Sequence, residues 1–320
     1  MSGDLLAGVE AAAGLAVYGG SPAAVRDELV AAGIPGLLAS KDPTLWGTAA
    51  EARAKSRLGW VDAYRRSREL LPQLAELCEE LADLTSVVVC GPAAAANAIT
   101  RSLGVPLWDL DATDPERTVV VLTGPSAEAD RFRQAYLDAG LTEAEAGRHF
   151  VVVATPDSPL SAAGGLLVPA DPDVTGAWGA LTAATLVPAA LARVDVAELL
   201  DEAELLAPSL AGDTDNPALA LGVALAQAEG TVALRSDGTG FEGFGDWAAE
   251  LLTGMLPVVV ESAGAFTVSY GGSLPPASVP GGGVRPDVAV NGPLGAQFLA
   301  WQFAAAIAAR LRGVDPFRDN

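Results

Sequence analysis

The sequence has few of the side chains that most enzymes use for proton transfer and for binding anions. Its 320 residues include one histidine (His149), two lysines (Lys41 and Lys55) and two cysteines (Cys78 and Cys90). Two cysteines cannot form a disulfide framework or a structural zinc site. Cys90 lies in an apolar run, which predicts a buried, inert thiol. A mechanism that needs a His–Lys or Cys–His pair in the C-terminal half is therefore excluded within one chain.

Positive charge is also scarce, with 19 Lys and Arg against 40 Asp and Glu, a net charge of −21 and a pI of about 4.2. So acidic a chain repels nucleic acids and anionic membrane surfaces, and neither is expected as a partner. Asp4 and Glu10 interrupt the first apolar stretch, so we expect no signal peptide. The longest apolar run, 177–192, is too short to span a bilayer and predicts a core helix. Together these features predict a soluble, cytoplasmic protein.

What the sequence does contain is the composition and patterning of a globular α/β protein. It is 50% hydrophobic and 18% charged, and long enough for two ordinary domains or one large one. Residues 86–91, 117–124 and 148–155 are short, β-branched and continuously apolar, which is typical of strands buried on both faces. Helical patterns at 93–103 and 126–139 separate them. This alternation predicts βαβ units in a doubly wound parallel sheet.

Further elements follow from hydrophobic periodicity and from stop residues. Ala-rich stretches predict helices at 5–17 and 22–32, and leucines between 70 and 81 predict a longer amphipathic helix. The Gly- and Pro-rich stretch 271–290 predicts a loop. In the C-terminal half we expect helices at 178–192, 195–207, 217–229, 246–252 and 294–312, and strands at 231–235 and 256–261.

In doubly wound sheets, ligands bind where the carboxyl ends of strands meet helix N-termini. Two such turns, 89–95 and 122–128, each contain a proline that removes a backbone donor. Glu128 repels phosphate but complements the helix dipole, so a helix capped by Ser126 is favoured over a phosphate cradle. If these turns bind a substrate, the candidate binding residues are Gly91, Thr123, Gly124 and Ser126.

Three other features could carry chemistry, and each has a simpler structural interpretation. His149 lies between a helix and a strand, where a hydrogen-bonded turn histidine is favoured over a general base. Asp109, Asp111 and Asp114 have no accompanying histidine, so a solvated strand end is favoured over a metal site. Glu261 ends an apolar strand and is the one carboxylate that could act as a buried base. A carboxylate in solvent at the end of the strand is favoured over that role. We expect no cofactor and no metal.

The sequence resembles glucose-6-phosphate isomerases of the short bacterial type, in an ordered set of stretches that covers nearly the whole chain. The matching stretches are 41–47, 57–62, 67–71, 180–182, 186–189, 244–247, 256–259, 292–298 and 313–317. This resemblance implies two sugar-isomerase (SIS) domains, each a parallel sheet sandwiched by helices. The domains it implies are an N-terminal helical segment (1–60), a first SIS-like domain (61–180) and a second, reduced one with a C-terminal helix (181–320).

The family's catalytic residues do not carry over to this sequence. Its phosphate loop is replaced by residues 123–128, and its arginine corresponds to Ala177. The segment that carries its glutamate base is shortened to 248–255. The resemblance therefore predicts a pseudoenzyme with a regulatory or scaffolding role, as a homodimer or as the partner of a sugar-phosphate enzyme. The apolar C-terminal helix, with Trp301 and Phe303, is expected to form such an interface.

Two alternatives stay open. The chain could retain an altered sugar-phosphate isomerase activity, with Glu261 as base and Arg235 or Arg285 as the phosphate ligand. It could also sense a sugar phosphate without chemistry, and saturable stabilisation by the ligand would then distinguish it from a pure scaffold.

Overall fold

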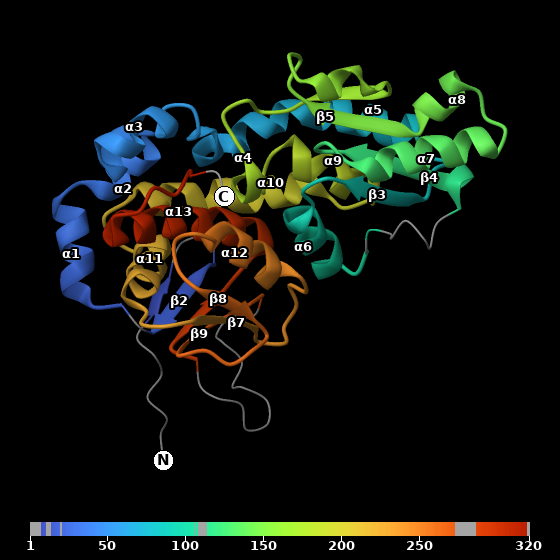
Figure 1. Cartoon of the computed structure of the whole chain (residues 1–320). Coiled ribbons are helices and arrows are strands. Elements are labelled where there is room, and N and C mark those ends of the chain that lie inside the picture. The colour runs from blue at the N-terminus through green and yellow to red at the C-terminus, as the bar shows by residue number, and fades with distance from the viewer. Residues whose placement is uncertain are drawn as a thin grey trace.

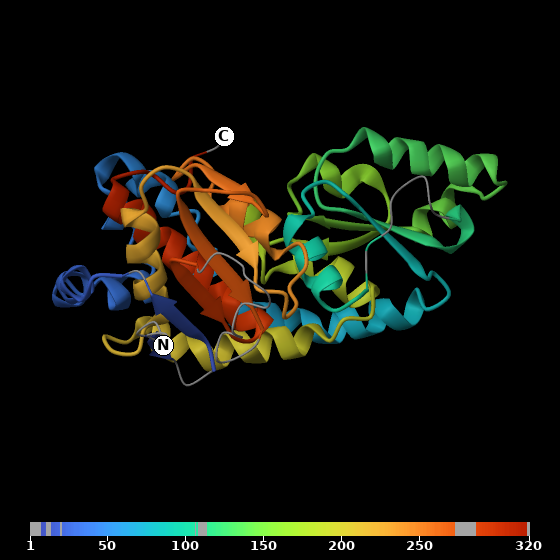
Figure 2. The same cartoon turned by 90° about the horizontal axis from the view of Figure 1, so that it is seen from below.

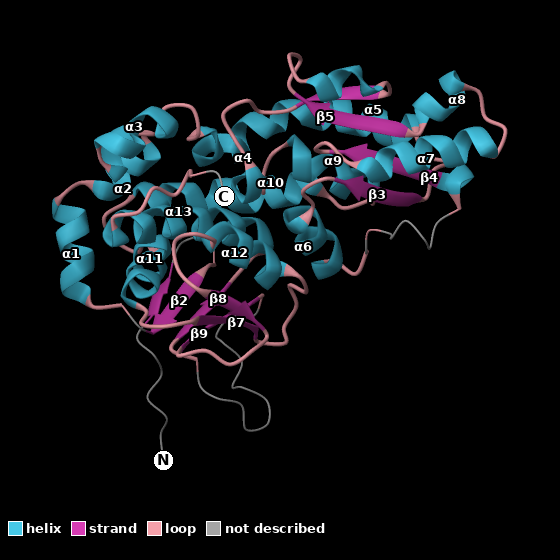
Figure 3. Cartoon of the chain, viewed as in Figure 1, coloured by secondary structure: helices cyan, strands magenta, loops and turns pink. Residues whose placement is uncertain are grey.

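The chain folds around two separate β-sheets in the computed structural model, which describes residues 8–10, 14–19, 21–105, 107, 114–272 and 286–318. Figure 1 shows the chain coloured along its length, and Figure 2 shows the two sheets in different halves of the molecule. Helices cover the sheets and fill the space between the halves (Figure 3).

The helices are α1 (Ala23–Ala31), α2 (Ile34–Ala39), α3 (Thr48–Ala54), α4 (Ala63–Arg66), α5 (Leu71–Glu80), α6 (Ala94–Ser102), α7 (Ala127–Asp138), α8 (Glu143–Arg148), α9 (Ala183–Leu191), α10 (Val196–Ala211), α11 (Pro217–Gln227), α12 (Phe244–Leu252) and α13 (Leu294–Arg312). The strands are β1 (Gly8–Glu10), β2 (Ala16–Gly19), β3 (Ser86–Cys90), β4 (Thr118–Leu122), β5 (Phe150–Ala154), β6 (Leu166–Pro169), β7 (Val232–Ser236), β8 (Val258–Val260), β9 (Phe266–Gly271) and β10 (Val288–Asn291).

The first sheet has the order β3-β4-β5-β6, and all its strands are parallel. Alternate residues face two different cores: Val119 and Val121 belong to the main core, whereas Val120 and Leu122 pack with Phe132 in a smaller one. Both faces are therefore buried, which is why these strands are continuously apolar. The predicted strands and the helices between them are confirmed here.

The second sheet has the order β1-β2-β10-β9-β7-β8. Strands β10, β9, β7 and β8 are parallel, and β2 joins β10 in the antiparallel sense. Helix α13 packs beside this sheet, against α10 and α11 (Figure 1). It ends at Arg312 and is capped by Gly313, whose φ of 66° is the left-handed conformation that stops a helix.

Two predictions of secondary structure are wrong. The stretch predicted as a helix at 5–17 contains strand β1 and the first two residues of β2 in its described part. Its alanines favour a helix locally, but pairing of β2 with β10 overrides that preference. The loop predicted at 271–290 contains most of β10, whose partners β2 and β9 are distant in sequence. Residues 273–285 of that loop lie outside the described residues.

Helix α13 does not form an exposed interface, contrary to the expectation from its apolar sequence. Trp301 is fully buried and Phe303 is 3% exposed within the single chain. Trp301 packs on Phe244 with ring centroids 5.8 Å apart, and Phe303 packs on Trp60 at 5.3 Å. The helix is apolar all round because it lies in the centre of the core. No helix in the described ranges is long and apolar enough to cross a membrane.

Candidate functional site

A cleft of about 280 Å³ opens at the carboxyl edge of the first sheet. The turns after β3 and β4 form one wall, and the segment 170–185 forms another. Helix α12 closes it from the second half of the molecule with Trp247 and Glu250. We call this the sheet-edge cleft, and it lies where parallel α/β sheets bind their ligands.

The turns after β3 and β4 touch each other at this edge. Gly91 has a φ of 119°, and a Cβ atom there would lie 2.6 Å from the Gly124 nitrogen and 2.7 Å from Thr123 Oγ1. Only glycine fits this close approach. The Thr123 hydroxyl donates a hydrogen bond to the Pro92 carbonyl at 3.0 Å. The structure thus brings Gly91, Thr123 and Gly124 together, but it uses the Thr123 hydroxyl to join the two turns.

Ser126 is the N-cap of α7, as its sequence context predicts. Its Oγ accepts a hydrogen bond from the Glu128 nitrogen at 3.2 Å. Glu128 and Asp130 stand in the first turn, where negative charge complements the helix dipole. An anion at this helix end would meet both carboxylates.

Glu250 of α12 also lines the cleft. It was not predicted from the sequence, because it lies in segment 248–255, which is shorter than the segment that carries the glutamate base in the isomerase family. Its side chain reaches solvent, yet the cleft walls desolvate the carboxyl and raise its pKa above the usual range. Its carboxylate has no hydrogen-bond or ion-pair partner in the described part of the chain. Ala177, at the position expected for an arginine, lines the same cleft.

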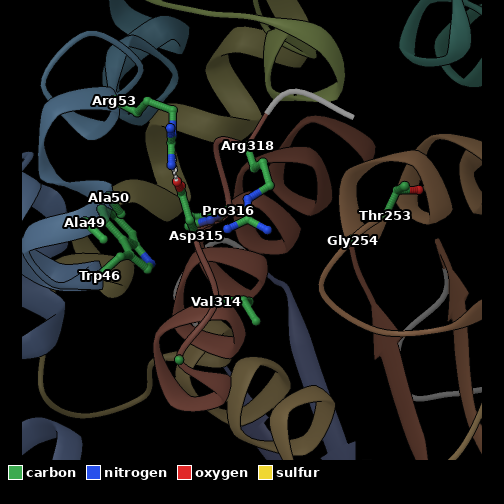
Figure 4. Close-up of a pocket in the computed structure, with 11 residues that line it drawn as sticks. Trp46, Ala49, Ala50, Arg53, Thr253, Gly254, Val314, Asp315, Pro316 and Arg318 are labelled. Carbon is green, nitrogen blue, oxygen red and sulfur yellow. Dashed lines mark hydrogen bonds and ion pairs between the residues drawn. The ribbon is translucent and has the colours of Figure 1, made fainter.

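A second cavity of about 280 Å³ adjoins the first, because Thr175, Ala177 and Glu250 line both. Arg57 and Arg318 also line this second cavity, which we call the arginine groove. The groove continues into a third cavity of about 340 Å³, which shares Thr253, Pro316 and Arg318 with it (Figure 4).

Figure 4 shows how the third cavity is assembled. The C-terminal tail, with Asp315 and Arg318, runs between Trp46 and Arg53 on one side and Thr253 on the other. Arg53 donates from Nε to Asp315 Oδ2 at 2.7 Å, so the charge of Arg53 is neutralised by the tail.

Glu261 is exposed and lines none of the cavities described above, so it is not a buried base. Its Oε1 accepts hydrogen bonds from the Ser236 nitrogen at 2.6 Å and from the Tyr270 hydroxyl at 3.3 Å. These bonds hold Glu261 at a φ of 47° and tie the end of β8 to β7 and β9. Arg235 is exposed on β7, and Arg285 lies outside the described residues.

His149 follows α8 and is 6% exposed. Its Nδ1 lies 2.8 Å from the Thr118 carbonyl, and its ring packs on Tyr136 with centroids 4.5 Å apart. This confirms the interpretation of His149 as a hydrogen-bonded structural residue.

The aspartates considered as a metal site are only partly described. Asp114 accepts a hydrogen bond from the Glu116 nitrogen at a 3-10 turn, whereas Asp109 and Asp111 lie outside the described residues. Within the described ranges, no group of three or more His, Cys, Asp or Glu could hold a metal ion.

A further cavity of about 500 Å³ lies at the carboxyl edge of the second sheet, with Glu198 and Glu202 on one wall. Glu202 accepts a hydrogen bond from the Gly295 nitrogen at 2.7 Å and thereby caps α13. Burial raises the pKa of Glu202, and the neighbouring Glu198 adds to the effect. Both glutamates project from α10, which joins the two halves.

The chain has two α/β units, one with a parallel sheet and one with a mixed sheet, and a cleft at the carboxyl edge of the first. This arrangement is similar to the fold of a glucose-6-phosphate isomerase. A glucose-6-phosphate isomerase from Chlamydia trachomatis superposes with a TM-score of 0.68 and 13% identity, over 96% of this chain and 86% of that one. A hypothetical protein from Thermus thermophilus superposes with a TM-score of 0.67 and 18% identity, over 90% of this chain and 94% of that one.

Neither a family model nor a curated protein matches the sequence. At these identities the structural similarity establishes the fold alone. The predicted α/β class with helix-covered parallel sheets is confirmed, and the distant structural relationship to glucose-6-phosphate isomerase is supported. The domain boundaries at residues 60 and 180 stay a prediction.

Proposed function

We propose that the protein is a non-catalytic relative of sugar-phosphate isomerases that has a ligand-sensing or regulatory role. This proposal rests on the side chains of the sheet-edge cleft: hydroxyls there are hydrogen-bonded within the protein, and one stretch of the wall has no polar side-chain atoms. The hydroxyl of Thr123 donates to the Pro92 carbonyl, and those of Thr182 and Thr185 donate to the Gly179 carbonyl. Positions 92–95 are proline and alanines, so their side chains offer no polar atom to a ligand.

Isomerisation of an aldose to a ketose moves a proton between C1 and C2 through an enediol. It needs a base within hydrogen-bond reach of that proton and groups that hold the substrate in place. Loss of a positioned base alone typically costs about two to four orders of magnitude in rate. In the sheet-edge cleft, Asp171 is ion-paired with Arg66, and no described lining residue is cationic. A bound phosphate would therefore meet carboxylates there rather than a counter-charge.

The decisive experiment is hydrogen exchange at C2 of glucose 6-phosphate in D₂O, followed by proton NMR with the protein at high concentration. We expect no exchange above that of a heat-denatured control. Exchange that the native protein catalyses would refute the proposal, since an enediol forms only if a base removes that proton.

One observation favours a second candidate, a residual isomerase in which Glu250 is the base. A carboxyl whose pKa is raised by its surroundings is better matched to proton transfer near neutral pH than an ordinary one. In the exchange assay, this candidate predicts a signal that Glu250→Gln abolishes and that Glu261→Gln leaves intact. Loss of the signal in Glu261→Gln alone would instead support the alternative based on Glu261.

The regulatory role implies a protein partner, which we propose to be a second copy of the chain or a sugar-phosphate enzyme. Because α13 is buried in the core, the partner must bind elsewhere on the surface. Light scattering at micromolar concentration tests the homodimer. A strict monomer would leave only the second kind of partner.

A further inference from the structure

The sheet-edge cleft contains a carboxylate that the protein leaves without a partner. Glu250 lines the cleft, and burial raises the pKa of its carboxyl. In the described part of the chain, no ion pair or hydrogen bond engages this carboxylate. Asp171, the other acid of the lining, is instead ion-paired with Arg66. A carboxylate taken partly out of water without a counter-charge costs free energy, which makes Glu250 a candidate for ligand binding.

The hydroxyl groups of the cleft present oxygens rather than hydrogens to a ligand. A threonine hydroxyl has one hydrogen and two lone pairs. Thr123 donates its hydrogen to the Pro92 carbonyl at 3.0 Å. Thr182 and Thr185 donate theirs to the Gly179 carbonyl at 2.8 and 3.1 Å. These three oxygens can therefore accept hydrogen bonds from a ligand, but they have no hydrogen left to donate.

Donors are scarce among the side chains of the lining. The Trp247 indole donates its N–H to the Ala177 carbonyl at 2.9 Å. Thr175, whose oxygen accepts from Arg57, is the one described lining side chain that keeps a hydrogen to donate. On the backbone, Pro92 has no N–H, and the first turn of α6 supplies the N–H groups of that wall. The side chains of the cleft therefore present mainly acceptors and one unpaired negative charge.

We infer that the sheet-edge cleft binds a small primary amine through its ammonium group. An ammonium group has three hydrogens to donate and no acceptor, which complements a lining of acceptor oxygens. Glu250 supplies the opposite charge, and the three threonine oxygens accept from other hydrogens of the ligand. A phosphate group presents acceptor oxygens and negative charge, so it matches this lining poorly.

The rest of the lining limits what else the ligand can carry. Val153, Val174 and Ala184 give the cleft an apolar part that suits a short hydrocarbon chain. The backbone N–H groups at the start of α6 suit an acceptor, such as a hydroxyl, at the other end of the ligand. The volume of about 280 Å³ admits a metabolite but not a polymer. This inference names the ligand class for the proposed sensing role and rests on that role only for its use in the cell.

Isothermal titration calorimetry at pH 8 tests the site with three probes that differ in one group: ethanolamine, ethylene glycol and glycolate. At this pH amines are protonated, so ethanolamine carries the ammonium group. We expect ethanolamine to bind saturably, ethylene glycol to bind at least about tenfold more weakly, and glycolate not to bind. Glu250→Gln keeps the size of the side chain and removes its charge, and we expect at least about tenfold weaker binding of ethanolamine.

The pH dependence and a matched variant show whether the carboxylate itself holds the ligand. Protons compete with the ammonium group for Glu250, so ethanolamine binds more weakly as the pH falls toward the raised pKa of this carboxyl. In Glu250→Gln, the residual binding does not change over that pH range. Glu229 is exposed after α11 and lines none of the cavities described above. Glu229→Gln therefore makes the same charge change and leaves both the affinity and its pH dependence intact.

Three results would overturn the inference. They are the absence of saturable ethanolamine binding, glycolate binding as tight as that of ethanolamine, and equal weakening by Glu229→Gln and Glu250→Gln, which would show attraction by overall charge only. The assay in D₂O separates these failures from failure of the proposed function. Ethanolamine binding together with C2 exchange would refute the non-catalytic role alone. Absence of both would refute the amine site alone.

Discussion

Substitution of Gly222 by alanine tests how tightly α11 packs on α13, the central helix of the protein. A Cβ atom at position 222 would lie 2.8 Å from the Ala304 carbonyl oxygen and 2.8 Å from Cβ and Cγ2 of Ile307. Ordinary contacts of this kind are about 3.5–4.0 Å, so the two helices must separate to accept it. The opposing atoms are backbone and a β-branched carbon, neither of which can rotate away.

Two opposing effects decide the sign of the change in stability. Alanine in place of glycine in a helix stabilises by about 1 kcal/mol through backbone entropy and helix propensity. Overpacking of a well-packed core costs about 1–3 kcal/mol, and fixed backbone atoms favour the upper part of that range. We therefore expect Gly222→Ala to lower the free energy of unfolding by about 1–2 kcal/mol, which corresponds to about 2–5 °C in Tm.

Gly36 in α2 is the matched control, because nothing lies within 4 Å of its added Cβ and its φ is negative. Gly36→Ala keeps the entropic gain without the clash and should stabilise by about 0.5–1 kcal/mol. Urea unfolding, followed by tryptophan fluorescence, measures both variants against the wild type. If Gly222→Ala is as stable as Gly36→Ala, the close packing of α11 on α13 is refuted.

Two further predictions concern surface charge and the thiols. The Arg148 guanidinium lies 2.7 Å from the Asp83 carboxylate and lowers its pKa to about 2. The pair therefore stabilises the folded state above about pH 4, and this stabilisation is lost as the pH falls from about 4 to about 2. Asp83→Asn should flatten that part of the Tm profile, and an unchanged profile would contradict the pairing. Burial raises the pKa of both Cys78 and Cys90, so the native protein should react slowly with a disulfide reagent at pH 7. Rapid reaction before unfolding in guanidinium would show that these thiols are accessible.

Much of the fold could be predicted from the sequence because it depends on local patterns. The strands of the first sheet are buried on both faces and so are apolar throughout, and α13 begins and ends where the predicted helix does. Strands β1, β2 and β10 could not be predicted in this way. Their conformation is decided by the pairing of β2 and β10, which are about 270 residues apart in the sequence.

The candidate site shows the same division. The cap at Ser126 and the structural role of His149 follow from neighbouring residues, and the structure confirms both. Glu250 was not predicted, because the segment that carries the glutamate base in the isomerase family is shortened here and its motif is absent. Its one sequence signal was that it is the only carboxylate in 248–255.

The sequence by itself determined the α/β class, the buried parallel strands of the first sheet and the scarcity of cations and histidines. These properties depend only on composition and on the periodicity of neighbouring residues. Only the tertiary structure decided that α13 is core rather than interface, since an apolar helix has the same sequence pattern in either place. It likewise decided that Glu261 faces solvent while Glu250 faces a cleft. The grouping of Arg57, Arg318 and Glu250 also depends on chain folding, because no local pattern relates residues from three distant segments.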